Sequence, residues 1–435
     1  MIPSRRLLLL ALALGALGIA PALRPELAAI WSSLAGLLLL TMLIDGIRGL
    51  RPPDVSVNRH HPGAWSQGRW HDCRLSLALA SGRPLRLEVF DHYPSGWEMR
   101  GLPHALQAPL QPGHSVELSF GLRPPQRGDH AFGRCELRIS SPWGLWQRRQ
   151  WTGSAETVRV FPDFARILHH SIHATDTRQQ GGVLRRRRRG EGTDFHQLRE
   201  YRQGDSLRTI DWHATARFQK PISREYQEER DQQIIFLLDC SRRMQAQDDE
   251  RSHFDHALDA MLLLAWTAQK QGDSIGVYTF GGIERWLAPM KGRAAIDRLL
   301  QGVYDLQPTL AIPDYLAATE RVLEKARKRS FIVLLTNLRD EDESTLAPSL
   351  QLLNERHLTL CASLREVALD RAIEAPVSTF EGALRHAAGQ GYQQARRQAL
   401  RRLGVRTREF LDVTPQQLPA ALVNNYLKLK ESGQL

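Results

Sequence analysis

The sequence has few cysteines and none of the short motifs that mark common catalytic folds. Its four cysteines, Cys73, Cys135, Cys240 and Cys361, are far apart and form no CxxC pair. This spacing argues against a disulfide framework or a zinc site and favours free thiols in a reducing compartment. The sequence also contains no Walker A pattern and no HExxH helix. Its one G-x-S-x-G match, at 272–276, begins a predicted strand instead of joining a strand to a helix, so these motifs offer no catalytic assignment.

Positive charge is the main bias of the composition. Lys and Arg total 58 and Asp and Glu total 47, which gives a formal net charge of +11. That balance favours acidic partners, namely anionic lipid, nucleic acid or an acidic protein. A hydrophobic content of 42% supports folded cores, and 435 residues leave room for two or three domains.

Two nearly uncharged apolar segments begin the chain, at residues 7–23 and 27–47. The second can cross a bilayer, which takes about 20 residues, whereas the first is marginal in length and contains Pro21. The sequence at 20–22 also resembles a signal-peptidase site. Cleavage there would leave the second apolar segment almost at the new N-terminus, which is an unusual arrangement. We therefore favour an uncleaved transmembrane helical hairpin over residues 1–50. Its outer ends carry Arg5, Arg6, Arg48 and Arg51 and its turn is neutral, which predicts that both ends lie in the cytoplasm.

Residues 51–165 alternate apolar and polar side chains in short stretches. Examples are residues 74–79, 86–90, 115–120 and 136–139, with glycine and proline between them. This pattern predicts an antiparallel β-sandwich. We expect Trp143 and Trp146 to pack the sandwich, rather than to form a surface for a partner.

Residues 166–231 form a basic linker followed by a charged segment. The linker contains five consecutive arginines, Arg185, Arg186, Arg187, Arg188 and Arg189. They could contact anionic phospholipid or an acidic protein, because the linker follows a membrane segment. A solvated loop whose arginines pair with neighbouring acids is an equal alternative. Nucleic acid is disfavoured because no recognition motif accompanies the run.

The most specific pattern lies between residues 192 and 226, which we call the signature segment. Its marked positions are Gly192, Asp194, Phe195, Leu198, Arg199, Tyr201, Gly204, Asp205, Arg208, Ile210, Asp211, Trp212, Ala216, Arg217, Arg224, Glu225 and Tyr226. Asp194, Asp205 and Asp211 could suggest acid/base chemistry, but nearly every acid has a basic neighbour and no nucleophile stands beside a base. We expect a structural lattice of ion pairs, with Trp212 and Tyr226 as apolar anchors onto the next domain.

The signature segment resembles that of the bacterial family called domain of unknown function fifty-eight. Members of that family are typically membrane-anchored, carry a von Willebrand factor A-like domain after the signature, and are often encoded beside a MoxR-type AAA+ ATPase. The resemblance implies a partner of that ATPase class and a place in the bacterial inner membrane.

Residues 232–435 alternate strand and helix patterns. Strands are predicted at 234–238, 274–280, 331–335, 358–364 and 405–413, and helices at 254–271, 294–306, 314–328, 344–356, 380–403 and from 415. This alternation predicts an α/β doubly wound sheet, and its order resembles a von Willebrand factor A-like domain.

Domains of that class often bind a divalent cation at the carboxyl edge of the sheet. The resemblance implies an Asp-x-Ser-x-Ser loop, a threonine in a second loop and an aspartate in a third. Asp239 and Ser241 match the first loop, but Arg243 replaces the second hydroxyl, Pro313 occupies the threonine position and Asn337 replaces the aspartate. A dication needs several oxygen ligands, so the sequence predicts a degenerate site with no metal and no cofactor.

Two details of this edge follow from the same alignment. Thr309 could supply the missing hydroxyl only by a shift in register. Arg243 could pair with Asp239 in place of a cation, or together with Asn337 could meet a partner's carboxylate.

The whole sequence predicts a membrane-anchored, cytoplasm-facing scaffold or adaptor that is not an enzyme. It would serve the assembly or maturation of envelope or membrane complexes. One alternative is an enzyme centred on Asp194, Asp205 and Asp211. Another is a basic module that binds lipid or RNA through the arginine run at 185–189.

Overall fold

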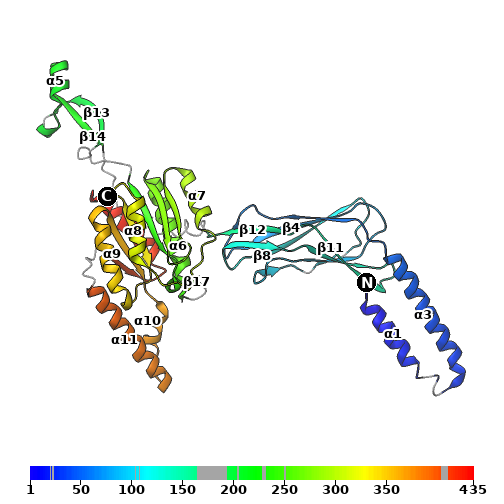
Figure 1. Cartoon of the computed structure of the whole chain (residues 1–435). Coiled ribbons are helices and arrows are strands. Elements are labelled where there is room, and N and C mark those ends of the chain that lie inside the picture. Colours follow the sequence, from blue (N-terminus) through cyan, green and yellow to red (C-terminus); the bar gives the residue numbers. More distant parts are fainter. Residues whose placement is uncertain are drawn as a thin grey trace. The chain divides into compact units, whose positions relative to one another are not determined.

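The computed structural model of the chain describes residues 1–19, 21, 24–102, 104–106, 108–163, 194–202, 205–227, 232–248, 251–402 and 410–435. The chain divides into two compact units, Met1–Asp163 and Phe164–Leu435 (Figure 1).

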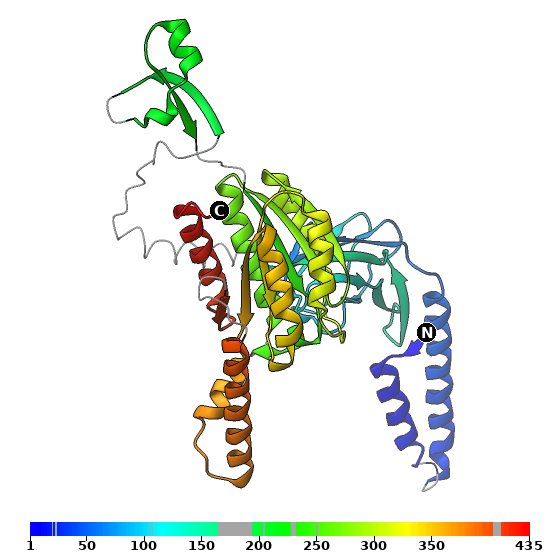
Figure 2. The same cartoon turned by 60° about the vertical axis from the view of Figure 1, so that its left-hand side comes forward.

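Two helices begin the first unit, α1 (Arg5–Leu17) and α3 (Ala28–Gly49), with the short 3-10 turn η1 (Pro25–Leu27) before α3. They lie side by side in both views (Figure 1 and Figure 2), and the Trp31 indole donates to the Leu14 carbonyl at 3.0 Å. Among the described residues, Pro25–Gly49 is the one helical stretch long and apolar enough to cross a membrane. The 13 residues of α1 span only about 20 Å, less than the hydrocarbon core of about 30 Å. A second membrane crossing is therefore not established by the helices.

The last turns of α3 are joined to the loop at 141–146 through a buried acid. The Asp45 carboxylate accepts hydrogen bonds from the Ser141 hydroxyl and from the backbone N–H groups of Trp143, at 3.0 Å, and Leu145, at 3.1 Å. The Trp146 indole donates to an α3 carbonyl at 3.0 Å. The expectation that these tryptophans pack the sandwich is wrong: Trp146 lies against α3 and Trp143 is exposed.

The rest of the first unit consists of sheets around one core. A four-stranded antiparallel sheet contains, in order, β2 (Val55–His60), β4 (His71–Leu79), β8 (Ser115–Arg123) and β6 (Glu98–Arg100). A five-stranded sheet contains β1 (Ile2–Pro3), β11 (Trp146–Thr152), β10 (Cys135–Ser140), β5 (Leu87–Asp91) and β7 (His104–Ala105). A smaller sheet contains β3 (Trp65–Ser66), β12 (Glu156–Phe161) and β9 (Gly128–Phe132).

Alternating apolar side chains of these strands share the core. Leu75 and Leu77 of β4 meet Val89 of β5 and Leu137 of β10, all fully buried. The two larger sheets are antiparallel and alternate as predicted, because every second side chain of a strand points to the same face. The smaller sheet differs, because β3 pairs with β12 in parallel.

The second unit contains a small hairpin and a larger α/β domain. The hairpin pairs β13 (Asp194–Glu200) with β14 (Ile222–Gln227), and between them lie η2 (Leu207–Thr209) and α5 (Trp212–Phe218). It holds the described part of the signature segment.

The α/β domain has a six-stranded sheet in the order β19-β18-β15-β20-β21-β22. These strands are β15 (Gln233–Asp239), β18 (Ser274–Phe280), β19 (Arg285–Met290), β20 (Phe331–Thr336), β21 (Leu358–Leu364) and β22 (Phe410–Val413). All neighbours are parallel except β19, an antiparallel edge strand that the sequence pattern missed. Pro289 interrupts the strand pattern in the sequence, so β19 was not predicted. A proline is tolerated in an edge strand because no further strand needs its N–H.

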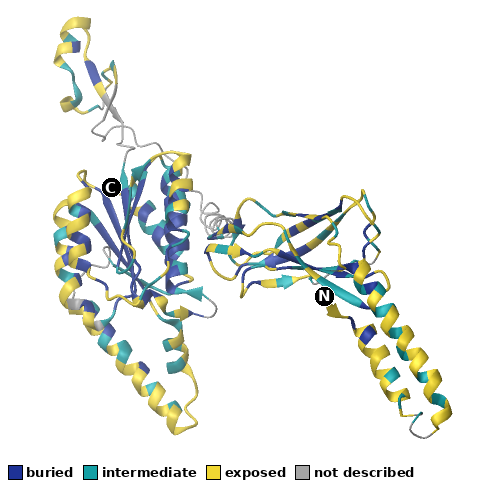
Figure 3. Ribbon diagram, turned by 45° about the vertical axis from the view of Figure 1, so that its right-hand side comes forward, coloured by how far each residue is buried: buried dark blue, intermediate teal, exposed yellow. Residues whose placement is uncertain are grey.

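Helices cover both faces of this sheet. They are α6 (His253–Lys270), α7 (Arg293–Val303), α8 (Tyr315–Lys325), α9 (Glu343–Arg356), α10 (Val367–Glu374), α11 (Phe380–Arg402) and α12 (Leu418–Glu431). Ile234, Phe236 and Leu238 pack with α6, α7 and α12, whereas Ile235 and Leu237 pack with α8 and α9. Figure 3 shows the strands buried between helices with exposed outer faces. The doubly wound class agrees with the prediction, and α10 was missed.

All four cysteines are free and buried in these cores. Burial raises the pKa of Cys73 and that of Cys135 to about 12, so both are neutral thiols.

Candidate functional site

The sheet order places a topological switch point between β15 and β20. From β15 the chain moves to β18 on one side, and it then returns to β20 on the other side. Ligands of open α/β sheets bind outside the carboxyl ends of strands at such a point. We use the name carboxyl edge for the loops gathered there, residues 240–245, 281–284, 308–314 and 337–342.

Asp239 ends β15 and is fully buried. Its carboxylate accepts hydrogen bonds from the Ser241 backbone N–H at 2.8 Å and from the Thr336 hydroxyl at 2.7 Å. The Tyr315 hydroxyl lies 2.9 Å from that of Thr336, which extends the chain of hydrogen bonds. Burial raises the pKa of Asp239, and the bonds from Thr336 and Ser241 oppose that effect. Both carboxylate oxygens therefore have internal partners.

Arg243 does not form the expected pair with Asp239. Its guanidinium pairs with Asp342, and it donates to Glu341 at 2.6 Å. The side chain of Arg243 is 3% exposed and that of Asp342 is 5% exposed. Arg243 is thus not available to a partner's carboxylate in this structure, because internal acids after β20 already neutralise it. The expectation of a free Arg243 was wrong.

Asn337 lies in a buried polar chain at the same edge. Its amide contacts His253 Nδ1 at 3.3 Å and donates to Glu366 at 3.1 Å, while His253 Nε2 lies 2.9 Å from an Asp248 oxygen. A neutral imidazole that donates from Nε2 to Asp248 can accept from Asn337 at Nδ1. Both ring nitrogens then have partners, so His253 has none left to act as a base.

The loops of the carboxyl edge hold one another in place. The Thr309 backbone N–H and hydroxyl donate to the carbonyls of Cys240 and Gly281, both at 2.8 Å. A Cβ on Gly281, whose φ is +71°, would lie 2.9 Å from the Cβ of Ser241. Glycine is required there, because the backbone adopts the left-handed region and the loops approach closely. Thr309 is a structural link between loops.

These residues do not fit a dication in the present arrangement. The carboxylate of Asp239 is engaged, Pro313 is buried and has no side-chain oxygen, and Asn337 turns its donor toward His253 and Glu366. Arg243, which stands where the second hydroxyl would be, is buried and has no lone pair to offer a cation. No cluster of three or more His, Cys, Asp or Glu suited to a metal occurs within the described part of the chain.

Large apolar side chains are exposed on the loops of the carboxyl edge and at the start of α8. Leu310 is 80% exposed, Ile312 67% and Ile283 49%, and Leu316 in the first turn of α8 is also exposed. Their loops are in contact, because Thr309 bonds to Gly281. We call Ile283, Leu310, Ile312 and Leu316 the apolar rim. Exposed apolar groups gathered beside a polar centre are typical of a surface that binds protein. Sequence reasoning missed the rim, although the apolar loop at 310–312 was a visible signal.

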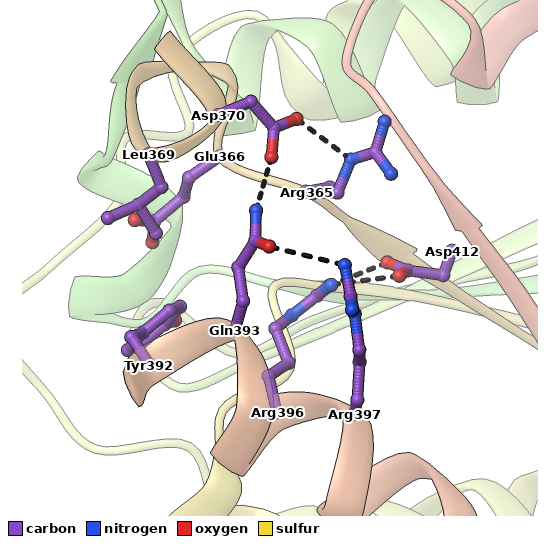
Figure 4. A pocket seen from close by; sticks show the side chains of 9 residues that line it. All are labelled: Arg365, Glu366, Leu369, Asp370, Tyr392, Gln393, Arg396, Arg397 and Asp412. Carbon is purple, nitrogen blue, oxygen red and sulfur yellow. Dashed lines mark hydrogen bonds and ion pairs between the residues drawn. The ribbon is translucent and has the colours of Figure 1, made fainter. Parts of the chain in front are cut away.

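A hollow of about 90 Å³ lies apart from the carboxyl-edge loops, near β21 and β22 (Figure 4). Arg396 of α11 donates to Asp412 at 2.7 and 2.9 Å, to the Ser363 hydroxyl and to two backbone carbonyls. Asp370 accepts from Gln393 at 2.6 Å and pairs with Arg365. These charges satisfy one another and hold α11 on the sheet, which favours a structural role.

The acids of the signature segment also have structural roles. Asp211 caps α5, where it accepts from two backbone N–H groups at 3.0 Å, and it pairs with Arg224 at 2.8 Å. Asp205 pairs with Arg199 at 2.7 Å. The hydrogen bond from Arg199 lowers the pKa of Asp205, and the Ala214 N–H is the main cause of the lowered pKa of Asp211. Neither acid is tuned to act near neutral pH.

Other marked positions of the segment have simpler placements. The Tyr201 hydroxyl donates to the Asp205 carbonyl, Arg208 lies in η2, and Arg217 lies over the Phe218 ring. Trp212 is 71% exposed, so the expectation that it is a buried anchor was wrong. Gly192, Gly204 and the arginines at 185–189 lie outside the described residues, as do the side chains of Asp194, Glu225 and Tyr226.

The fold and this edge define a class, a doubly wound α/β domain with a polar switch point, preceded by a charged hairpin. Residues 197–383 match the family described as "Protein of unknown function DUF58". The match begins in β13 and ends in α11, so it covers most of the signature segment and the carboxyl edge. It agrees with the resemblance drawn from the signature.

One curated relative is the "Uncharacterized protein YeaD" of Bacillus subtilis, 24% identical over 133 residues. That alignment covers 29% of this chain and 31% of YeaD, about a third of the relative's length.

Solved structures show weaker likeness. An aerotolerance-related membrane protein from Bacteroides fragilis has a TM-score of 0.31 at 14% identity, over 46% of this chain and 99% of that one. Proximal thread matrix protein 1 from the mussel byssus has a TM-score of 0.28 at 13% identity, over 45% of this chain and 46% of that chain. No conclusion rests on likenesses at these scores.

Proposed function

We propose that this chain is a membrane-anchored scaffold whose α/β domain binds a protein partner at the carboxyl edge, without a metal ion. The observation that carries the proposal is the apolar rim around a buried, charge-balanced centre. Three of the rim side chains belong to loops at the switch point and Leu316 begins the adjoining helix α8, and open α/β sheets bind their ligands at such a point. Apolar area removed from water contributes about 25 cal/mol per Å² to association.

The pair between Arg243 and Asp342 supports metal independence. Arg243 has no lone pair to offer a cation, and its pair with Asp342 engages that acid as well. With Arg243 neutralised from within, recognition at the rim depends on shape and apolar contact. The von Willebrand factor A-like identity of the domain is part of this proposal.

For the partner we propose a MoxR-type AAA+ ATPase, which the family resemblance implies. We place the anchor in the bacterial inner membrane, with an α1–α3 hairpin and the domains that follow residue 51 in the cytoplasm. The arginines at the outer ends of the helices and the neutral turn support that orientation. A reporter active only outside the cytoplasm, fused after Leu435, should stay silent.

An enzyme centred on the signature segment is the alternative from another class. The pairing of Asp205 with Arg199 and of Asp211 with Arg224 favours structural roles. If biological activity survives Asp205→Asn and Asp211→Asn in a folded protein, the enzyme hypothesis fails.

Binding of the full chain in detergent to the purified ATPase encoded in the same genome tests the proposal. Leu310→Asp with Ile312→Asp should weaken binding by at least about tenfold, since each charge disrupts an apolar contact. The matched control places aspartates at Val377 and Leu384, which are also exposed apolar residues of the α/β domain. Equal affinity of wild type and the rim variant would overturn the proposed site.

A further inference from the structure

Three arginines, Arg6, Arg48 and Arg83, lie where α3 meets the loop at 141–146, and Arg5 and Arg51 are close to Arg6 and Arg48 in the sequence. We call them the arginine collar. The Arg48 guanidinium lies 5.5 Å from the centroid of the exposed Trp143 ring. The Arg6 guanidinium would lie 3.5 Å from a Cβ on Gly144. Burial and the charge of Arg48 lower the pKa of Arg83, opposed by Asp45, so Arg83 also lies at this junction. Segments far apart in the sequence thus bring their cations together.

The collar has no acids of its own. Within the described residues none of its five arginines forms an ion pair, and the Asp45 carboxylate beside it is buried and accepts three hydrogen bonds. On the four-stranded sheet of the same unit, by contrast, Arg100 pairs with Asp72 and Arg123 with Glu98. The collar is therefore a concentration of positive charge that favours an external anion.

An apolar hollow of about 400 Å³ lies beside the collar. It is lined by Leu39, Met42, Leu43, Ile47 and Leu50 of the α3 end and by Trp146. Pro25–Gly49 is long and apolar enough to cross a membrane. With α3 as the proposed anchor, the hollow would face the hydrocarbon and the collar would lie at the headgroup level. Arginine and tryptophan are both favoured at that level.

We propose that the collar and the hollow together bind an anionic phospholipid, with the phosphate headgroup on the arginines and an acyl chain in the hollow. This inference rests on the anchoring by α3 in the proposed function. A guanidinium can donate two parallel N–H bonds to phosphate oxygens. Zwitterionic lipid offers the same phosphate but no net charge, so the collar prefers anionic lipid.

The test uses the full chain in vesicles of equal parts phosphatidylglycerol and phosphatidylethanolamine. A polymer that retains adjacent lipid extracts the protein, and mass spectrometry measures both lipids. Wild type should be enriched in phosphatidylglycerol, and the triple change Arg6→Gln, Arg48→Gln, Arg83→Gln should reduce the enrichment by about tenfold. A control that removes the same charge elsewhere, Arg74→Gln, Arg100→Gln, Arg123→Gln, should keep it. The version with lysine at the three collar positions should keep most of it.

Equal enrichment in wild type and the glutamine variant would overturn the inference, as would its loss when excess inorganic phosphate is added. Thermal unfolding checks that each variant is folded. If the glutamine variant does not fold, the lysine version replaces it in the test. Loss of enrichment in a folded lysine version would also contradict recognition of the lipid by charge. Alkaline carbonate extraction separates the two proposals. If wild type leaves the membrane the anchoring fails, whereas if all variants stay but enrich equally only the lipid site fails.

Discussion

The arginine collar of the first unit and the carboxyl edge of the second unit differ in how far their positive charges are paired with acids. Beside the collar Asp45 is buried and accepts three hydrogen bonds, and among the residues that the structure describes the five arginines form no ion pair. At the carboxyl edge Arg243 is buried and paired with Asp342 and Glu341, and the exposed groups around it are apolar. The first surface suits an anionic lipid, and the second suits a protein whose contact is largely apolar.

This difference shows that net charge alone says little about partners. The formal +11 is shared by the whole chain, yet one surface leaves cations unpaired and the other neutralises them from within. The type of partner depends on whether each charge has an internal partner. An exposed unpaired charge attracts a counter-ion, whereas around a paired charge the apolar neighbours determine what binds.

Removing the acid of the collar junction should have the largest effect on stability. Asp45→Ala leaves the Ser141 hydroxyl and two backbone N–H groups without their acceptor, which should cost about 4 kcal/mol of unfolding free energy. Denaturation of the full chain in mild detergent measures this. Asp45→Asn keeps one acceptor oxygen and should lose less. Unchanged stability in Asp45→Ala would mean that the junction is not held as described.

Breaking the pair at the carboxyl edge should cost somewhat less. Arg243→Met leaves the buried Asp342 without its counter-charge, at about 3 kcal/mol. The double change Arg243→Met, Asp342→Asn should recover part of that loss, because no charge is then left buried alone. A double variant as unstable as the sum of the two single variants would contradict the pairing.

Much of the fold could be predicted because its signals are local. The apolar run at 234–238 identified β15, and alternation at 74–79 identified β4, since each pattern has the period of its element. The pairs that define the two surfaces could not be predicted in this way. Asp45 and Ser141 are 96 residues apart, and Arg243 and Glu341 are 98 apart. No periodic pattern connects such distant residues. The sequence therefore indicated Asp239 and Arg243 as residues of the edge, but suggested a pair between them that the structure does not contain.

Metal binding offers a test of the carboxyl edge with a smaller expected signal. Calorimetry of the full chain in detergent should show weak or no binding of Mg²⁺, because the edge supplies too few free oxygen ligands. The triple change Arg243→Ser, Pro313→Thr, Asn337→Asp should create binding that the wild type lacks. Stoichiometric binding by the wild type, abolished by Asp239→Ala, would show that the loops rearrange to form a metal site.

The smallest predicted effect concerns acid pH beside the carboxyl edge. Burial, with the charge of Arg251, lowers the pKa of His256 to about 4 from an ordinary 6.5, while Asp255 and Asp248 oppose the shift. Between these values the unfolded chain binds more protons, so stability is full above pH 6.5 and falls as the pH drops toward 4. His256→Gln should flatten this slope in urea unfolding at pH 7 and pH 5. Parallel slopes in both proteins would exclude His256 as the cause.

The most direct test of the central claim is photocrosslinking from position 310 of the apolar rim. The full chain in its native membrane carries the crosslinker there, with the MoxR-type ATPase present, and the reaction is run with and without a chelator of divalent cations. We predict an adduct with the ATPase of equal yield in both samples. Failure to form an adduct, or an adduct that disappears with chelator and returns with Mg²⁺, would contradict a metal-independent protein site at this edge.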